Sequence, residues 1–219
     1  MEKIVIALDG PSGSGKSTIA KALSAKLNVL YLDTGAMYRA TALKALNLGI
    51  DTLDAEMVDT FINDVDIEIK YIDGAQHTFL DGEDVSLKIR EPHMSMAASN
   101  ISSLKNVRIK MVDMQRKIAG GMSCILDGRD IGSYVLPNAD YKFYVTATSK
   151  VRAKRRYDEL TAKGFDIDFD TLLKEIEQRD YNDMNREFSP LVQAKDAIYL
   201  DTSDMTIDEV ICAVLGYIK

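Results

Sequence analysis

The sequence has few of the residue types that build metal or disulfide sites, since its 219 residues include two cysteines and two histidines. Cys124 and Cys212 lie in apolar segments without metal-ligand spacing, so we expect two reduced, buried thiols. His77 and His93 are each isolated in sequence, and we assign neither to a metal. The cysteine and histidine content therefore gives no support to a disulfide framework or a metal centre built from these residues.

Long apolar runs and excess positive charge are also lacking. No apolar stretch approaches the roughly 20 residues that a helix needs to span a bilayer, and Met1-Glu2-Lys3 lead directly into the first apolar run. We therefore expect a cytoplasmic protein with no leader and no membrane partner. The formal net charge of −7 disfavours a general affinity for nucleic acid, because proteins with that affinity usually present a broad basic surface. An anionic substrate would have to meet local clusters of cations.

The order of apolar segments predicts an α/β fold. Apolar, β-branched runs recur at residues 4–8, 29–32, 123–126, 141–146 and 197–200, separated by segments with helical periodicity. This alternation favours a mainly parallel sheet covered on both faces. Asp9-Gly10, Asp33-Thr34 and Asp127-Gly128 follow three of the runs, and they are expected to gather at the carboxyl edge, where open α/β sheets bind ligands.

One segment departs from this alternation. Polar and apolar residues alternate over 66–71, and Asp73-Gly74 and Asp81-Gly82 are signals for two tight turns, with short partner strands at 77–80 and 83–85. We predict a small antiparallel sheet inserted into the α/β chain, flanked by helices near 55–63 and 95–118. A surface hairpin without function is the alternative.

Residues 10–17 fit the pattern of a phosphate-binding loop, Gly, any four residues, then Gly-Lys-Ser, and they follow the first apolar run. Glycines let successive backbone N–H groups turn onto a polyphosphate, Lys16 reaches the outer phosphates, and the Ser17 hydroxyl is placed to ligate Mg²⁺. Ile19, Leu23 and Leu27 continue at helical spacing, so the loop opens a helix whose N-terminal dipole favours phosphate. A Gly-Ser-rich turn without a ligand is the alternative.

Cations cluster at two further places. Arg152, Arg155 and Arg156 share one helix face after the fourth strand, which favours a mobile lid over a triphosphate, although a solvated helix face is the commoner role of such runs. Arg179, Asp183 and Arg186 are spaced to share one face of a helix that begins near residue 170; they either bind sugar hydroxyls and an anion or form surface ion pairs.

The Asp127-Gly128-Arg129-Asp130 segment ends an apolar strand, where Asp127 has the position of a Mg²⁺-associated acid and a capping turn is the alternative. No histidine lies in a context that suits a general base. A nucleoside monophosphate needs none, because its phosphate has a second pKa of about 6 and is already largely ionised.

Taken together, residues 10–18, 32–39, 127–132 and 179–190 closely resemble the bacterial type of cytidylate kinase, in order and spacing over essentially the whole chain. The resemblance implies a single domain over 1–219. Its fold is a P-loop three-layer α/β fold with a central five-stranded parallel sheet, a small antiparallel insert and a helical lid. It implies a core at about 1–35, 119–150 and 190–219, a region that binds the nucleoside monophosphate (NMP) at about 36–118, and a lid at about 151–166.

The resemblance also assigns roles. The ATP-binding residues would be Gly10, Pro11, Ser12, Gly13, Ser14, Gly15, Lys16, Ser17 and Thr18. The acceptor phosphate would be held by Tyr38, Arg39 and Arg129, the sugar by Arg179 and Asp183, and the cytosine ring by Thr34, Ser99, Arg108, Asp130 and Arg186. The catalytic set would be Lys16, Arg129, Arg155, Arg156 and Arg179, and Arg152 lies beside the two lid arginines of this set. Mg²⁺ would accompany ATP at Ser17 and, through water, Asp127. Thr34 stands where many relatives have Ser, which keeps the hydroxyl and adds a methyl.

These roles are chemically consistent with cytosine. Asp130 can accept the amino hydrogen while Arg108 and Ser99 donate to the ring acceptors, whereas uracil would place a carbonyl opposite Asp130. We therefore expect transfer of the ATP γ-phosphate to CMP or dCMP by a monomer, with CMP strongly preferred over UMP. The alternatives are a related kinase acting on UMP, AMP or another small acceptor, and a nucleotide switch or ATPase module that binds a protein.

Overall fold

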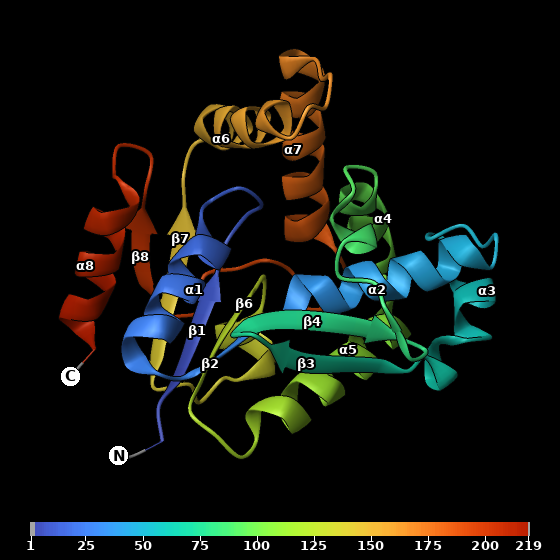
Figure 1. The fold of residues 1–219 in the computed structure, drawn as a ribbon, viewed down its shortest axis with the longest axis horizontal. Helices are drawn as coiled ribbons and strands as arrows, with labels where there is room; N and C mark the ends of the chain where they lie inside the picture. The colour runs from blue at the N-terminus through green and yellow to red at the C-terminus, as the bar shows by residue number, and fades with distance from the viewer. Residues whose placement is uncertain (1–2, 219) are drawn as a thin grey trace. The chain divides into compact units, whose positions relative to one another are not determined.

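The computed structural model describes residues 3–218, so Met1 and Glu2, on which part of the no-leader expectation rests, lie outside the described part. The chain forms two compact units: unit 1 comprises Met1–Tyr31 and Met122–Lys219, and unit 2 comprises Leu32–Gly121 (Figure 1). The predicted NMP-binding region, 36–118, falls within unit 2, and the single-domain organisation stays a prediction. Among the described residues, no helix combines the length and apolar composition that a bilayer crossing requires.

The five-stranded parallel sheet predicted from the apolar runs is confirmed. Its strands have the order β2-β6-β1-β7-β8. They are β1 (Val5–Asp9), β2 (Leu30–Asp33), β6 (Cys124–Gly128), β7 (Tyr141–Thr146) and β8 (Ile198–Asp201). The central strand β1 pairs in parallel with β6 and β7, in a register that aligns Asp9 with Gly128 and with Tyr144. The last residue of β1 is therefore held from both sides.

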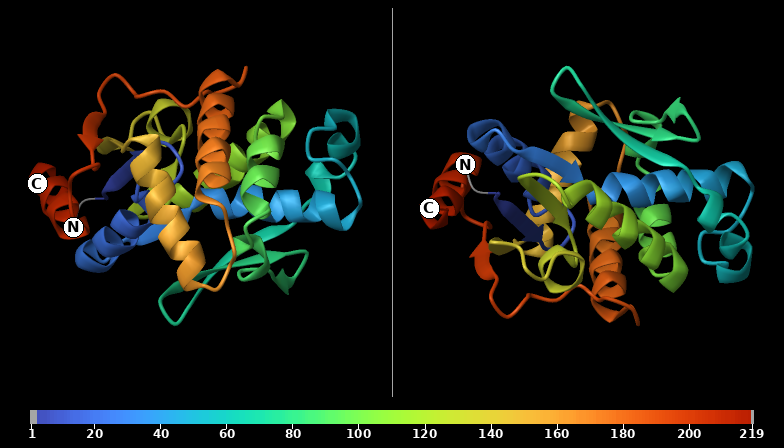
Figure 2. Two further views of the ribbon diagram at one scale, coloured as in Figure 1. Left: turned by 90° about the horizontal axis from the view of Figure 1, so that it is seen from above. Right: turned by 90° about the horizontal axis from the view of Figure 1, so that it is seen from below.

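The main core of unit 1 lies between this sheet and two helices, α1 (Lys16–Leu27) and α8 (Ile207–Tyr217), which lie side by side in both views of Figure 2. Alternate residues of the strands, such as Ile6, Leu8 and Phe143, are fully or almost fully buried against them. Period-2 apolar residues on strands thus meet period-3.6 apolar residues on helices. Cys124 is buried as predicted, but the same prediction is wrong for Cys212, which lies on the exposed face of α8.

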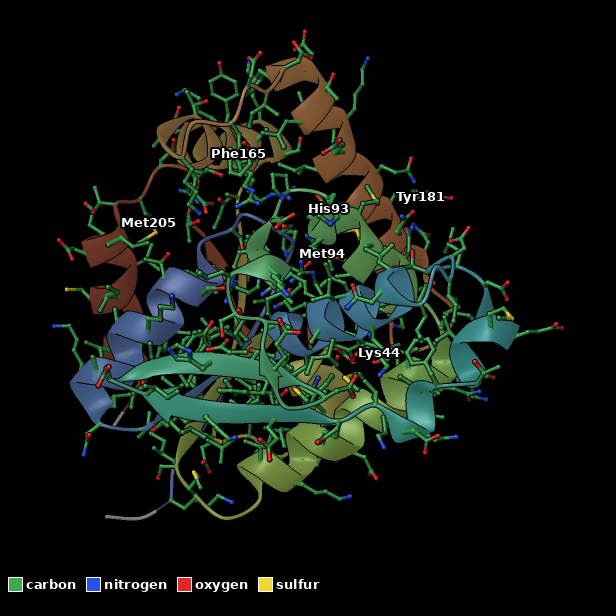
Figure 3. All side chains as sticks on the ribbon, turned by 45° about the vertical axis from the view of Figure 1, so that its right-hand side comes forward. Lys44, His93, Met94, Phe165, Tyr181 and Met205 are labelled. Atoms are coloured by element: carbon green, nitrogen blue, oxygen red, sulfur yellow. The ribbon has the colours of Figure 1, made fainter. Side chains whose placement is uncertain are left out.

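Two further helices of unit 1 share a second, smaller core. These are α6 (Ser149–Ala162), which begins at a Thr148 cap, and α7 (Phe169–Asn185), which begins at an Asp168 cap. Their buried side chains are Ala153, Leu160, Leu172 and Ile176. The turn between the helices contains Gly164, at φ +84°. On the outer side of α7, Tyr181 points away from the helix and is 65% exposed (Figure 3).

Unit 2 contains the predicted antiparallel insert. Strands β3 (Ile67–Ile72), β4 (Ala75–Leu80) and β5 (Glu83–Asp84) form a three-stranded sheet. Both connections are two-residue turns with positive φ at each position, namely Asp73-Gly74 and Asp81-Gly82. These are the backbone angles that Asp-Gly pairs favour in tight hairpins. Helix α2 (Thr34–Asn47) packs against β4, and Lys44 of α2 forms an ion pair with Asp81 (Figure 3).

Two of the predicted helices are wrong in extent. The segment 95–118 forms two helices, α4 (Met94–Ile101) and α5 (Lys105–Ala119). The chain breaks between them because the Ser102 hydroxyl donates to the Ser99 carbonyl, a local bond that competes with helical continuation. The segment 55–63 forms only the short α3 (Ala55–Asp59), followed by a 3₁₀ turn, η1 (Ile62–Asp64).

Candidate active site

The phosphate-binding loop joins β1 to α1, as its sequence pattern predicts. Gly10, Gly13 and Gly15 all have φ in the left-handed half of the map, at +143°, +76° and +90°. Gly10 has no alternative to glycine, because a Cβ there would lie 1.9 Å from the Val145 carbonyl oxygen. The loop thus leaves the central strand against the backbone of β7 and enters α1 with backbone N–H groups available for an anion.

Lys16 is folded across its own loop. Its Nζ donates to the Pro11 carbonyl at 2.6 Å and to the Ser14 hydroxyl at 3.1 Å, and the residue is 5% exposed. Burial lowers the pKa of Lys16 well below its usual value, and the nearby Arg129 adds to this effect, while the carboxylates of Asp127 and Asp9 oppose it. A bound polyphosphate would supply the negative charge that this ammonium group otherwise lacks.

The residues predicted to hold Mg²⁺ meet directly. Asp127, at the end of β6, accepts from the Ser17 hydroxyl at 2.7 Å and from the Tyr31 hydroxyl at 3.1 Å. The carboxylate is 5% exposed. Carboxylate and hydroxyl oxygens are hard ligands of the kind that Mg²⁺ selects. The donor set of Ser17 and Asp127 therefore fits a divalent cation delivered with a nucleotide.

The arginines of the predicted lid occupy three different environments. Arg152 is buried, where it donates to the Ser12 carbonyl at 2.9 Å and the Ala147 carbonyl at 2.8 Å and forms a bidentate ion pair with Asp180 of α7. Arg155 donates to the side chain and carbonyl of Thr202, at 3.1 and 2.6 Å. These two side chains are therefore tied to the rest of unit 1 rather than extended into solvent.

Arg156 is placed apart from them. It forms an ion pair with Glu159 on its own helix, at 2.8 Å. This agrees with the alternative prediction that the arginines lie on a solvated helix face. On α7, Arg179 donates to the Ser12 hydroxyl at 3.1 Å. The structure thus brings Lys16, Arg152 and Arg179 to the phosphate-binding loop. Arg155 contacts the loop indirectly: it donates to Thr202, and the Thr202 hydroxyl lies 3.4 Å from the Ser14 carbonyl.

A second polar cluster in unit 1 follows β6. Arg129 donates to Asp183 at 2.7 Å, and Asp130 accepts from the Ser189 hydroxyl at 2.5 Å. Arg186 donates to the Ser189 carbonyl at 2.6 Å and lies 3.6 Å from the Asp130 carboxylate. Burial raises the pKa of Asp183, but the surrounding guanidinium groups, above all that of Arg129, lower it by a larger amount. The pKa of Asp183 therefore lies below its usual value.

The prediction that Arg179, Asp183 and Arg186 share one helix face is wrong for Arg186. Helix α7 ends at Asn185, and Arg186 has extended backbone angles. Asp183 and Arg186 are nonetheless 3% and 8% exposed, so they are not the surface ion pairs of the alternative interpretation. The contacts within this cluster of buried charges hold its side chains in fixed positions.

In unit 2, the predicted residues form two groups. Arg39 donates to Asp33 at 2.9 Å, and Arg90, which the sequence analysis did not single out, donates to the same carboxylate at 2.6 Å. Burial opposes ionisation of Asp33, but the two guanidinium groups prevail and lower its pKa to about 2. Arg90 lacks a motif of its own in sequence, and only the 3₁₀ turn η2 (Lys88–Arg90) brings it to Asp33.

The second group surrounds Arg108, which is 1% exposed. Its guanidinium carbon lies 5.4 Å from the centre of the Tyr38 ring, and it donates to the Ser102 carbonyl at 3.3 Å. The Ser99 hydroxyl is buried and has no hydrogen-bond partner among the described residues. Thr34, the first residue of α2, is buried as well. A buried hydroxyl without a partner within the protein is able to donate to a polar ligand.

Unit 2 also contains a cavity of about 410 Å³ that is separate from the predicted site residues. It is lined by Asp59, Ile62, Asn63, Asn106, Ile109, Lys110 and Asp113. None of the predicted site residues lines it, and we assign no function to it.

Comparison with known proteins gives a consistent result. The family model described as cytidylate kinase matches residues 6–219. The chain is 52% identical to a cytidylate kinase from Caldicellulosiruptor bescii over 98% of this chain and 95% of that protein. It is 47% identical to one from Clostridioides difficile over the full length of both. Among solved structures, a gluconokinase from Sinorhizobium meliloti has a TM-score of 0.51 at 11% identity, covering 98% of this chain and 92% of that one, which indicates a shared fold alone.

Proposed function

This chain belongs to the cytidylate kinase family, and from that premise we propose which of its residues bind ATP, Mg²⁺ and CMP. The reaction is transfer of the γ-phosphate of ATP to CMP or dCMP, giving ADP and CDP or dCDP. The observation that carries the residue assignment is the buried Asp130 carboxylate, which Ser189 and Arg186 hold in place. A fixed hydrogen-bond acceptor is the group that the amino edge of cytosine requires.

On the donor side, we assign the triphosphate to residues 10–18. The Lys16 ammonium exchanges the Pro11 carbonyl for phosphate oxygens, and Arg179, already hydrogen-bonded to Ser12, adds positive charge beside the same loop. When bound at Ser17 and Asp127, Mg²⁺ would neutralise charge on the donor phosphates. Among the lid arginines, we assign Arg155 to the donor phosphates, because its partner Thr202 contacts Ser14 of the loop.

On the acceptor side, the proposed residues occur in both units. Unit 2 supplies Thr34, Tyr38, Arg39, Ser99 and Arg108, and unit 1 supplies Arg129, Asp130, Arg179, Asp183 and Arg186. We assign Arg39 and Arg129 to the CMP phosphate because arginine grips phosphate in a bidentate manner. Ser99 and Arg108 are donors for the ring acceptors of cytosine, which gives the Ser99 hydroxyl the partner that it lacks among residues 3–218.

The chemistry needs no general base. The attacking oxygen belongs to a phosphate that is already largely ionised at neutral pH, so the protein positions the two nucleotides and stabilises charge that builds up on the transferred group. The buried or half-buried cations that we assign to this task are Lys16, Arg129, Arg155, Arg156 and Arg179.

The test is a panel of monophosphate acceptors assayed with ATP and Mg²⁺ by coupled ADP detection. We expect ADP to form rapidly with CMP and dCMP, slowly with UMP, and hardly at all without an acceptor. Comparable turnover of CMP and UMP would contradict the base-binding roles, a preference for AMP would indicate a related kinase, and ADP release that ignores the acceptor would indicate an ATPase or switch.

A matched variant sharpens the test. In Asp130→Asn the amide offers a donor where the carboxylate accepted, which suits the uracil carbonyl and leaves the cytosine amino group facing a donor. We expect the ratio of kcat/KM for CMP over UMP to fall by about tenfold or more. An unchanged ratio would remove Asp130 from the base-binding set.

We further propose that the protein acts as a monomer in the cytoplasm, without nucleic acid or a membrane as partner. Light scattering coupled to size-exclusion chromatography measures the oligomeric state, with a mass near 24.3 kDa expected.

A further inference from the structure

Asp9 has no role in the ATP-binding, CMP-binding or catalytic sets proposed above, yet its carboxylate is 3% exposed in the middle of unit 1. It is the last residue of the central strand β1 and directly precedes the phosphate-binding loop. Its two carboxylate oxygens accept from the backbone N–H groups of Ile131 and Gly132, each at 2.7 Å. These N–H groups open the π-helical turn η3 (Ile131–Val135).

The reason that Asp9 is needed lies in Asp130. Asp130 occupies the N-cap position of η3, where an aspartate side chain ordinarily accepts from the second or third N–H group of the turn, that of Gly132 or Ser133. Here the Asp130 side chain makes no cap bond, because it accepts from Ser189 and faces Arg186 instead. The N–H groups of Ile131 and Gly132 would therefore lack an acceptor if Asp9 did not supply one.

Further features make this contact specific. β6 and β7 flank Asp9 in register, so the carboxylate projects from the most firmly held strand of the sheet. A Cβ at Gly132 would lie 3.3 Å from Asp9 Oδ2 and 3.1 Å from the Lys142 side chain, so glycine permits the close approach. The arrangement also carries a cost. Burial raises the pKa of Asp9 to about 7 even though both backbone bonds oppose that rise.

We propose that Asp9 is a positioning residue, which fixes the loop of residues 129–132 to the central strand and thereby holds the Asp130 carboxylate in position for the acceptor base and Arg129 in position for its phosphate. The inference rests on the proposed function, because it gives the purpose of residues assigned there. In this arrangement Asp9 holds the backbone of the turn, and the Asp130 side chain faces Ser189 and Arg186 instead of the turn.

The experiment replaces Asp9 by asparagine. The amide keeps the shape but offers one acceptor and one donor, so one of the two N–H groups faces a donor. We measure kcat and KM for CMP at saturating ATP, and the Kd of ADP without CMP by calorimetry. The expected result is a fall in kcat/KM for CMP of about tenfold, carried mainly by KM, with a smaller change in the Kd of ADP, because Asp9 also interacts with the charge of Lys16.

Asp140→Asn is the matched control. Asp140 is exposed and accepts from the N–H of Val5 at 2.7 Å, so it makes the same kind of bond to the other end of the same strand. We expect this variant to keep both kinetic constants. If Asp9→Asn does not fold, Gly132→Ala perturbs the same contact without removing the carboxylate and is judged by the same criteria.

The outcomes are distinct. Kinetic constants for Asp9→Asn that match those of Asp140→Asn, whatever the melting temperature, would overturn the positioning role, as would an equal loss of CMP and ADP affinity. If the unchanged protein shows no CMP-dependent ADP formation, the proposed function itself fails, and that result is obtained before any variant is made.

Discussion

Replacing Arg152 by methionine tests whether this arginine braces the phosphate-binding loop or belongs to a mobile lid. Its side chain is 5% exposed, and its partner Asp180 is 14% exposed. Methionine keeps most of the volume but leaves the Asp180 carboxylate without its cation. Breaking a buried pair from one side costs about 3–5 kcal/mol, and the slight exposure of Asp180 favours the lower end. The Ser12 and Ala147 carbonyls also lose a donor.

The assay is urea denaturation followed by circular dichroism, with Arg156→Met as the control on the same helix. Arg156 pairs with Glu159 at the surface, where their side chains are 29% and 46% exposed, so we expect a loss of at most about 1 kcal/mol. Adding Asp180→Leu to Arg152→Met should restore part of the lost stability, because no uncompensated charge remains. Equal losses from Arg152→Met and Arg156→Met would refute the bracing role.

Three further predictions follow from the loop and its strand. Lys16→Ala should nearly abolish turnover while the melting temperature changes little; an active variant would contradict the placement of the donor. Gly10→Ala should destabilise the fold by about 3 kcal/mol or more, because a Cβ would lie 1.9 Å from the Val145 carbonyl oxygen, and thermal denaturation matching that of the unchanged protein would be incompatible with this geometry. Asp9 has a pKa raised from 3.8 to about 7 by burial, so its protonated form favours the folded state and this contribution is lost as pH rises from about 4 to about 7. Relative to Asp9→Asn, the free energy of unfolding should fall by on the order of 4 kcal/mol across that range, and a difference that is constant with pH would rule this out.

Local patterns made much of the fold predictable. The strands could be located because apolar, β-branched runs are separated by helical segments, and the Asp-Gly pairs gave both hairpin turns because few residue pairs tolerate two positive φ values. The loop of residues 10–17 was recognisable because its glycines and Lys16 form a fixed spacing. In each case the signal and the structure lie within a few residues of one another.

The parts that could not be predicted depend on distant partners. Arg152 shares its helical spacing with Arg155 and Arg156, and nothing in that spacing reveals that Asp180 and Ser12 bury it. Arg90 reaches Asp33 from 57 residues away, and Asp9 reaches Ile131 from 122 residues away. The break between α4 and α5 was missed because it contains neither proline nor glycine. The roles of the individual site residues stay predictions.

The shared core of α6 and α7 limits how the arginines they carry can move. Bending at Gly164 would pull apart Leu160 and Leu172, whose burial is worth about 1.5–3 kcal/mol each, and would strain the bidentate link between Arg152 and Asp180. The helical pair is therefore expected to keep its shape as one piece, and Arg152 and Arg179, which both donate to Ser12, attach each of its helices to the phosphate-binding loop. The glycine in its turn serves to shape the corner.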